Sequence, residues 1–201
     1  MKYVKEKVYE SVFNIAKEIA KTKDGAIFVI GSKRKLKNKY SLLFKQVLQK
    51  TYVYEKGVSG VILKLATIDG GVIISDKGEL LAYGAHIKKS RPVTGLGTKH
   101  AAAAGITYAI PESTAIVVSE KADWIRVFQK GEIILETDSG KNPKGLQEKI
   151  ISFLTDRDTA LITTAGASAA LLGFGPVLVV SGAYLVIKTA TGIIKKNISK
   201  K

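Results

Sequence analysis

Two short stretches place an aspartate and glycine beside an apolar run, and either could carry chemistry. The first is "TKDGAIFVIG" at residues 22–31, and the second is "TIDGGVII" at residues 67–74. An aspartate at the start of a strand, followed by glycine, can present a carboxylate and bare backbone to one ligand. There it could hold a metal or accept a proton from a hydroxyl. A turn aspartate beside turn glycines gives the same pattern without chemistry, so Asp24 and Asp69 are alternatives.

A third stretch, "GLGTKHAAAAG" at residues 95–105, predicts an anion site. Thr98 lies where an N-cap is expected, and the four alanines after His100 favour a helix. The first N–H groups of a helix have no intrahelical partner and attract anions. Lys99 and His100 are locally unfavourable at this end, which indicates an anion that offsets them. The alternative is a well-capped core helix with two exposed cations.

Composition narrows the classes of function. The net charge of +15 indicates a polyanionic partner, and Lys and Arg gather without acids in residues 33–50 and 188–201. Such runs are also typical of solvated faces. The absence of cysteine excludes thiol and zinc–thiolate chemistry, and two histidines, His86 and His100, argue against an all-histidine metal site. Residues 1–23 lack the apolar core of a secretion signal.

Apolar periodicity predicts an α/β fold with a mixed central β-sheet flanked by helices. Helices are expected at residues 3–21 and 40–54 and after the glycine loop within 94–110. Strands are expected at residues 26–31, 60–68, 71–75, 80–87, 114–119, 124–129 and 132–136, with 71–87 as a hairpin. The predicted division is an N-terminal amphipathic helix (1–23), a main domain (24–136), a linker (137–158) and a hydrophobic helical tail with a basic end (159–201).

The tail contains 29 consecutive uncharged residues, 159–187. This exceeds the roughly 20 residues that cross a bilayer, so we expect a cytoplasmic main domain attached to a membrane through residues 159–194. A single span and a hairpin turning near Pro176 are both possible topologies. The alternative is a buried helix pair or an oligomerisation element.

The ordered motifs "IDGGVII … GTKHAAAAGIT … AIVVSE" resemble those of the diadenylate cyclase family over residues 24–136. That family carries an Asp-Gly-Ala motif, then Gly-Thr-Arg-His-Arg-Ala-Ala, then a Val-Val-Ser-Glu strand end. Its domain begins with a Gly-Ala-aliphatic strand, which residues 25–30 match. The resemblance therefore selects Asp69 as the functional acid and leaves Asp24 without a role.

The resemblance implies a metal-dependent nucleotidyltransferase that condenses two ATP into the second messenger cyclic di-AMP and releases two pyrophosphates. Each subunit would bind one ATP, and two subunits of a homodimer or higher oligomer would meet face to face. Asp69 would bind the 3′-hydroxyl and the metal, Mg²⁺ or Mn²⁺, with His100 as a second metal ligand. The implied nucleotide-binding residues are Gly70, Gly71, Ile87, Thr98, Lys99, His100, Ser119 and Glu120.

The sequence departs from the family motifs in ways that indicate a divergent, archaeal-like branch or a weakened enzyme. Gly71 replaces alanine, Lys99 replaces the first arginine, and Ala101 replaces the second arginine. Lys121 stands where many members carry a second glutamate. The alternative function is a non-catalytic module, tethered to the membrane, that binds ATP or cyclic di-AMP. A nucleic-acid partner is not expected, because the basic run at 33–50 has few aromatics and no recognised nucleic-acid fold signature.

Overall fold

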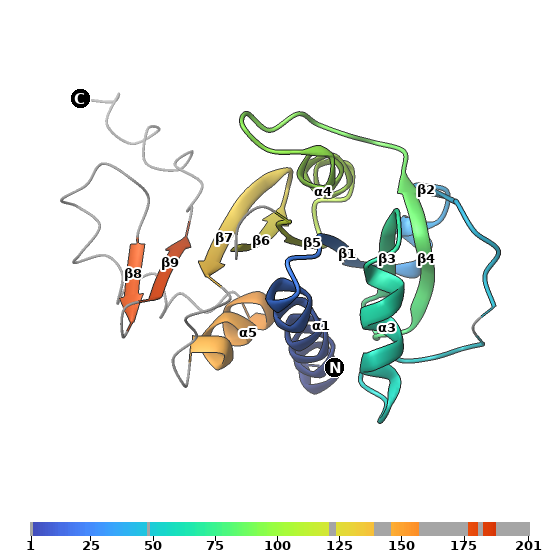
Figure 1. The fold of residues 1–201 in the computed structure, drawn as a ribbon, viewed down its shortest axis with the longest axis horizontal. Helices are drawn as coiled ribbons and strands as arrows, with labels where there is room; N and C mark the ends of the chain where they lie inside the picture. Colours follow the sequence, from blue (N-terminus) through green and yellow to red (C-terminus); the bar gives the residue numbers. More distant parts are fainter. Residues whose placement is uncertain are drawn as a thin grey trace, which may run out of the picture.

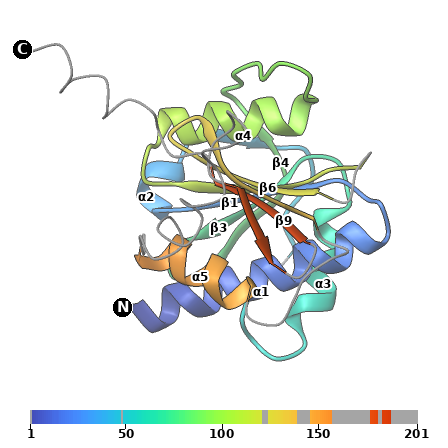
Figure 2. The ribbon, with the colours of Figure 1, turned by 90° about the vertical axis from the view of Figure 1, so that its left-hand side faces the viewer.

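A mixed β-sheet forms the centre of the molecule, with helices on both faces (Figure 2). The computed structural model describes residues 2–47, 49–120, 124–138, 146–156, 177–180 and 183–187. The strands found there follow the order β2-β4-β3-β1-β5-β6-β7-β9-β8 across the sheet. β1 and β3 are parallel, and the other neighbouring pairs are antiparallel. The strands are β1 (Ala26–Gly31), β2 (Tyr40–Leu42), β3 (Gly71–Ser75), β4 (Leu80–Ile87), β5 (Thr114–Val118), β6 (Trp124–Gln129), β7 (Glu132–Asp138), β8 (Val177–Val180) and β9 (Ala183–Ile187).

The helices divide unequally between the two faces of the sheet. α4 covers one face, and α1, α3 and α5 lie on the other (Figures 1 and 2). The helices are α1 (Lys2–Lys21), the single-turn α2 (Lys33–Leu36), α3 (Val58–Ala66), α4 (Thr98–Ala109) and α5 (Leu146–Asp156).

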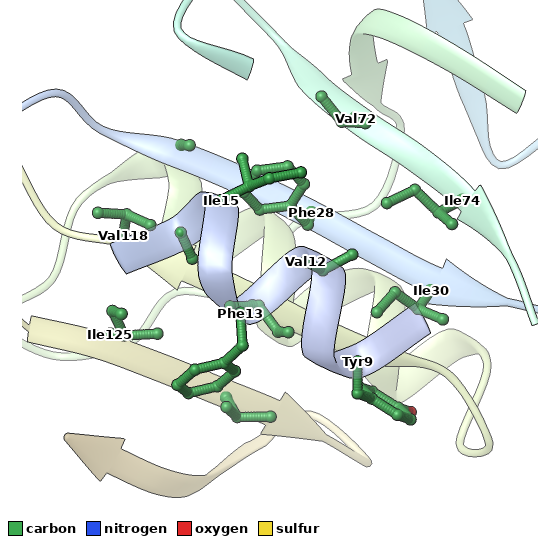
Figure 3. Packing of buried hydrophobic residues seen from close by; sticks show 14 of the residues in the cluster. Tyr9, Val12, Phe13, Ile15, Phe28, Ile30, Val72, Ile74, Val118 and Ile125 are labelled. Atoms are coloured by element: carbon green, nitrogen blue, oxygen red, sulfur yellow. The ribbon is translucent and has the colours of Figure 1, made fainter. Parts of the chain in front are cut away.

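Alternating side chains of the central strands fill two separate cores, as the two-residue period of a strand requires. On β1, Phe28 lies in the core shared with α1, and Val29 lies in the core shared with α4. Figure 3 shows Phe13 of α1 facing the strand that carries Ile125, with Ile15 close to Phe28. Each of these five side chains is at most 2 % exposed. The two cores pack the sheet between its helical layers, so the loops at the strand ends are positioned by packed elements.

Most of the elements expected from the sequence are confirmed. The amphipathic helix, the first buried strand, the hairpin of β3 and β4, and the strands β5 to β7 all form near their expected positions. The expected α/β class with a mixed central sheet and flanking helices is also confirmed.

The strand predicted for residues 60–68 is wrong, because these residues belong mostly to helix α3. The apolar run has strand length, but the buried side chains are Ile62 and Ala66, four residues apart on one helix face, with Val58 packed on the same core. Parallel strands need a long crossover connection, which is usually helical. α3 lies in the connection that brings the chain back from β1 to β3.

The helix predicted for residues 40–54 is also wrong. Residues 40–42 form β2, which pairs with the edge of β4. Beyond β2, the Gln46 side-chain amide accepts a hydrogen bond from the Tyr83 N–H at 3.0 Å and donates one to the Tyr83 carbonyl at 3.1 Å. These bonds satisfy the backbone N–H and C=O of Tyr83, which have no partner strand there among the described residues. The residues around Gln46 therefore run along the edge of the sheet.

The helical tail predicted for residues 159–201 is wrong where the structure describes it, because Val177–Val180 and Ala183–Ile187 are strands. β9 pairs with β7 and β8 pairs with β9, which extends the sheet. Both segments are rich in Val, Leu and Ile, residues that favour strands. The rest of the predicted tail lies outside the described residues. Among the helices that the structure describes, none has both the length and the apolar character needed to cross a membrane.

Part of the predicted linker, residues 137–158, has regular structure. Helix α5 begins at Leu146, and its buried residues Ile150 and Leu154 pack in the core beside α1. The Gln147 amide also joins the two helices through hydrogen bonds with Asn14 and Lys17. α5 is therefore part of the packed fold, and the domain boundaries themselves stay a prediction.

Candidate functional site

Asp69 lies in the short connection between α3 and β3, with its side chain exposed. Its Oδ1 accepts a hydrogen bond from the N–H of Gly70 at 2.9 Å. Gly70 has φ of +92°, and a Cβ there would lie 2.6 Å from the carbonyl carbon of Gly84 on β4. Only glycine suits this position, because a side chain would be strained and would meet backbone. The close approach of Gly70 to β4 fixes the aspartate at the mouth of a pocket.

This pocket, the Asp69 pocket, has a volume of about 420 Å³ between the β3–β4 strands and the start of α4. Its lining residues are Ile27, Leu43, Asp69, Gly70, Gly71, Ala85, His86, Ile87, Lys88, Ser90, Thr98, Lys99, Ala101 and Ala102. It thus brings a carboxylate, bare backbone and aliphatic side chains together with the first turn of a helix. Such a mixture can hold an apolar ring on one side and polar groups on the other.

The helix that faces this pocket begins one residue earlier than the sequence predicts. Gly97, with φ of −82°, is the N-cap of α4, and Thr98 is the first helical residue, so Thr98 makes no side-chain cap hydrogen bond. A glycine N-cap has no side-chain oxygen to accept from the first amides of the helix. These amides, at the positive end of the helix dipole, suit an anion.

A second pocket, the Arg126 pocket, has a volume of about 360 Å³ and lies on the other side of the same helix start. Its lining residues are Gly95, Leu96, Gly97, Thr98, Lys99, His100, Val118, Ser119, Glu120 and Arg126. Thr98 and Lys99 line both pockets. The first turn of α4 therefore lies between the two pockets and borders each of them.

Lys99 and Glu120 form an ion pair across the Arg126 pocket, with 2.5 Å between Nζ and Oε1. The lysine side chain is 30 % exposed and the glutamate side chain is 57 % exposed. Gly25, at the start of β1, leaves the room that the Glu120 side chain occupies, because a Cβ at Gly25 would overlap it. The end of the "VVSE" stretch and the Gly-Ala start of β1 thus meet at one place in the fold.

His100 is buried behind this ion pair and bonds to a residue of β6. Its Nε2 lies 3.2 Å from an Nη1 of Arg126, whose Nε donates to Glu136 Oε1 at 2.6 Å. Burial, and then the positive charge of Arg126, lower the pKa of His100 from 6.5 to about 4. The imidazole is therefore neutral at pH 7. Because arginine can only donate, Nε2 accepts and Nδ1 carries the proton.

The site residues expected from the sequence fall into two groups that share the start of α4. Asp69, Gly70, Gly71 and Ile87 line the Asp69 pocket, His100, Ser119 and Glu120 line the Arg126 pocket, and Thr98 and Lys99 line both. Asp24 lines neither pocket, and its Oδ2 accepts a hydrogen bond from Thr22 within a turn. Of the two aspartates, Asp69 is therefore the one that lies in a pocket beside the start of α4.

The carboxylates suit a divalent metal better than the histidine does. Asp69 and Glu120 supply the oxygen donors that Mg²⁺ and Mn²⁺ prefer. In contrast, the metal role expected for His100 finds no support here, because Arg126 occupies Nε2 and the other nitrogen carries the proton. Within the described part of the chain, no three His, Cys, Asp or Glu side chains gather into a metal cluster. Mg²⁺ is commonly held by one or two carboxylates together with substrate phosphates, and this arrangement fits such a site.

Sequence reasoning missed Arg126 and several residues that line the Asp69 pocket, including Leu43 and Lys88. Arg126 could have been found, because it is a lone charge between Ile125 and Val127 in a strand with strands on both sides. A charge in such a strand needs a partner or a ligand. Leu43 gave no comparable signal, because its segment was expected to be a helix.

The chain matches the family model described as "DisA bacterial checkpoint controller nucleotide-binding" (DAC) over residues 14–133. It therefore belongs to this family. The match covers α1 from its middle, the sheet as far as β7, and both pockets.

Two curated relatives carry the name diadenylate cyclase. The protein from Haloferax volcanii is 32 % identical over 142 residues, which are 65 % of this chain and 52 % of the relative. The protein from Methanocaldococcus jannaschii is 36 % identical over 93 residues, which are 45 % of this chain and 30 % of the relative. The chain thus spans about half or less of the length of these relatives.

A solved structure of a hypothetical membrane spanning protein from Bacillus cereus has the same kind of fold. It superposes with a TM-score of 0.50 at 16 % identity, covering 61 % of this chain and 59 % of that one. At this identity the likeness concerns the fold alone.

Proposed function

We propose that the chain is a diadenylate cyclase, which condenses two ATP into cyclic di-AMP and releases two pyrophosphates. The observation that carries the proposal is the position of the first turn of α4, where Thr98 and Lys99 border both pockets. One nucleotide can span this turn, with its nucleoside in the Asp69 pocket and its phosphates beside the helix start. Membership of the family and the two relatives named diadenylate cyclase support the same activity.

The Asp69 pocket suits an adenosine. Ile87, at the end of β4, offers an aliphatic surface to the base, and Gly71 lets the ligand approach the backbone of β3. The Asp69 carboxylate is exposed and can accept a hydrogen bond from a ribose hydroxyl. In this pose the 3′-hydroxyl is the group that Asp69 orients and deprotonates as it attacks.

The helix start suits the phosphates. The amides of the first turn of α4, together with the Lys99 ammonium, stabilise negative charge that develops on the α-phosphoryl group and on departing pyrophosphate. Phosphoryl transfer depends chiefly on such positioning and charge stabilisation. Ser119 and Glu120 line the same side of the helix start and complete the surroundings of the phosphates. A divalent cation, Mg²⁺ or Mn²⁺, held by a carboxylate and the phosphates would neutralise further charge.

The reaction needs two copies of the chain. One Asp69 pocket holds one adenosine, and the 3′-hydroxyl of each ATP must reach the α-phosphorus of the other. Two subunits that face each other across their nucleotides meet this requirement, and each of the two attacks releases one pyrophosphate. The specific rate should then rise with protein concentration until the dimer is fully formed.

The second candidate is a non-catalytic module that binds ATP or cyclic di-AMP. It is favoured by the Lys99–Glu120 ion pair, which offsets the lysine charge, and by the alanine at position 101 in place of an arginine. It predicts nucleotide binding without turnover.

The experiment that decides between them is incubation of the purified chain with ATP and Mn²⁺ or Mg²⁺, with cyclic di-AMP detected by mass spectrometry. We expect product from the unaltered chain and a loss of at least about a hundredfold in Asp69→Asn, the scale of a lost general base. Asp24→Asn is the matched control, because it removes the same carboxylate from a similar Asp-Gly sequence outside both pockets. A folded chain that binds ATP and forms no product would establish the second candidate instead.

A further inference from the structure

One cation of the site lies outside the motifs that the sequence analysis used. Arg126 lies in the middle of β6, between Ile125 and Val127, which are both fully buried. By the alternation of the strand, its side chain points to the opposite face, toward α4, as that of Phe128 does. The Arg126 side chain is only 14 % exposed, yet it lines the pocket beside the helix start.

The guanidinium connects the neighbouring strand to the helix. Arg126 is directly opposite Glu136 of β7 in the strand register, and its Nε donates to Glu136 Oε1 at 2.6 Å. An Nη1 of the same group reaches His100 in the first turn of α4. Arginine has five N–H donors in a rigid fork, so these two contacts leave donors for a further partner.

Phosphate oxygens are the partner that this geometry favours. The family motif has two arginines, and this chain has Lys99 and Ala101 at those positions, which leaves one motif cation beside the helix start. That remaining lysine is paired with Glu120. A guanidinium binds phosphate in a bidentate manner that lysine cannot reproduce.

We propose that Arg126 is a nucleotide-binding residue whose guanidinium contacts the phosphates in the Arg126 pocket, and that Glu136 is a positioning residue that holds it there. The inference rests on the proposed function for the site it completes, but it concerns binding and does not require turnover. β6 thus supplies a second cation, so the site keeps two positive side chains although the motif at the start of α4 lacks its second arginine.

The competing explanation is a purely structural one, in which Arg126 only links β6 to β7 through its ion pair with Glu136. The two explanations differ in which ligands should bind less tightly when Arg126 is replaced. A phosphate contact affects ATP and ADP and spares adenosine. A structural link affects all three ligands equally, or affects only stability.

The experiment measures the affinities of the full-length chain for adenosine, ADP and ATP by calorimetry, with thermal unfolding as a check on folding. We expect Arg126→Gln to weaken ATP binding by about 10- to 100-fold, the scale of a charge-assisted hydrogen bond, and to leave adenosine binding within twofold. Arg126→Lys, which keeps the charge and loses the fork, should recover part of the ATP affinity. Glu136→Gln, which keeps the cation but loosens it, should weaken ATP binding less than Arg126→Gln does.

The matched control is Lys33→Gln. It also removes one positive charge from an ion pair with a glutamate, Glu79 at 2.8 Å, but Lys33 lines neither pocket, so all three affinities should stay unchanged. A folded Arg126→Gln chain that binds ATP within twofold of the unaltered chain would overturn the inference, as would equal weakening of ATP and adenosine. Cyclic di-AMP formation by the unaltered chain is scored separately. If the unaltered chain forms cyclic di-AMP and Arg126→Gln binds ATP as tightly, this inference alone is refuted. If Arg126→Gln weakens ATP binding and the unaltered chain forms no product, the proposed activity alone is refuted.

Discussion

Mild acid should destabilise the folded chain through His100. An ordinary histidine has a pKa near 6.5, and the buried imidazole of His100 beside Arg126 has a pKa of about 4. Between these two values the unfolded chain binds the proton and the folded chain does not, so the free energy of unfolding falls as the pH falls. The stability that depends on a neutral His100 is fully present above pH 6.5 and is lost as the pH falls from 6.5 to 4.

The magnitude follows from the two pKa values. Each pKa unit between the folded and unfolded chain corresponds to about 1.4 kcal/mol, so the full difference in unfolding free energy is on the order of 3 kcal/mol below pH 4. pH 5 lies about 1.5 pH units below 6.5, so the free energy of unfolding is about 2 kcal/mol lower there than above pH 6.5. This is a large fraction of the 5–15 kcal/mol that is typical of a folded domain.

The assay is urea unfolding at pH 7 and at pH 5 for the unaltered chain and for His100→Asn, without nucleotide. The drop in unfolding free energy between the two pH values should be about 2 kcal/mol larger for the unaltered chain, because titrations common to both chains cancel. His86→Asn is the matched control, because it removes an exposed histidine and leaves His100 in place, so the drop that His100 causes should remain. If His100→Asn loses as much stability on acidification as the unaltered chain does, His100 is not held neutral and the description of its surroundings is wrong.

Three further predictions concern the packing and the tail. Gly70→Ala should lower the unfolding free energy by about 1–3 kcal/mol in urea titrations, because φ is +92° and the added Cβ would meet the backbone of Gly84; an unchanged midpoint would contradict that close approach. Phe13→Ala should cost about 3–5 kcal/mol in the same assay, since its fully buried ring faces the sheet, and a loss below 1 kcal/mol would contradict its core position. Membrane attachment through residues 159–194 stays a prediction: on fractionation the full chain should sediment with membranes and a 1–156 truncation, which keeps α5, should remain in the supernatant. Equal distribution of the two chains would refute it.

The parts of the fold that local pattern decides were predictable from the sequence. The run at 26–31, the hairpin that ends at Ile87 and the alanine-rich helix α4 each carry their signal within a few residues. Residues 58–66 carry an ambiguous signal, because a short aliphatic run suits either a buried strand or one face of a helix. The parallel pairing of β1 with β3 decides in favour of the helix, and that pairing depends on residues more than 40 positions apart.

The site was predictable to the same extent. The residues of the motifs do gather around the start of α4, because the start of β3 and the ends of β4 and β5 lie beside it. The contacts made from elsewhere were not predictable in detail. Gln46 holds its loop through Tyr83 on β4, and Arg126 reaches His100 from β6, and both contacts exist only once the sheet order is set.

The most direct test of the account is a structure of the chain bound to a non-hydrolysable ATP analogue and Mg²⁺. We predict one nucleotide per subunit, with adenosine in the Asp69 pocket against Ile87 and phosphates at the amides of Thr98 and Lys99. A nucleotide bound elsewhere, or one whose phosphates point away from the first turn of α4, would contradict the proposal that the two pockets form a single site.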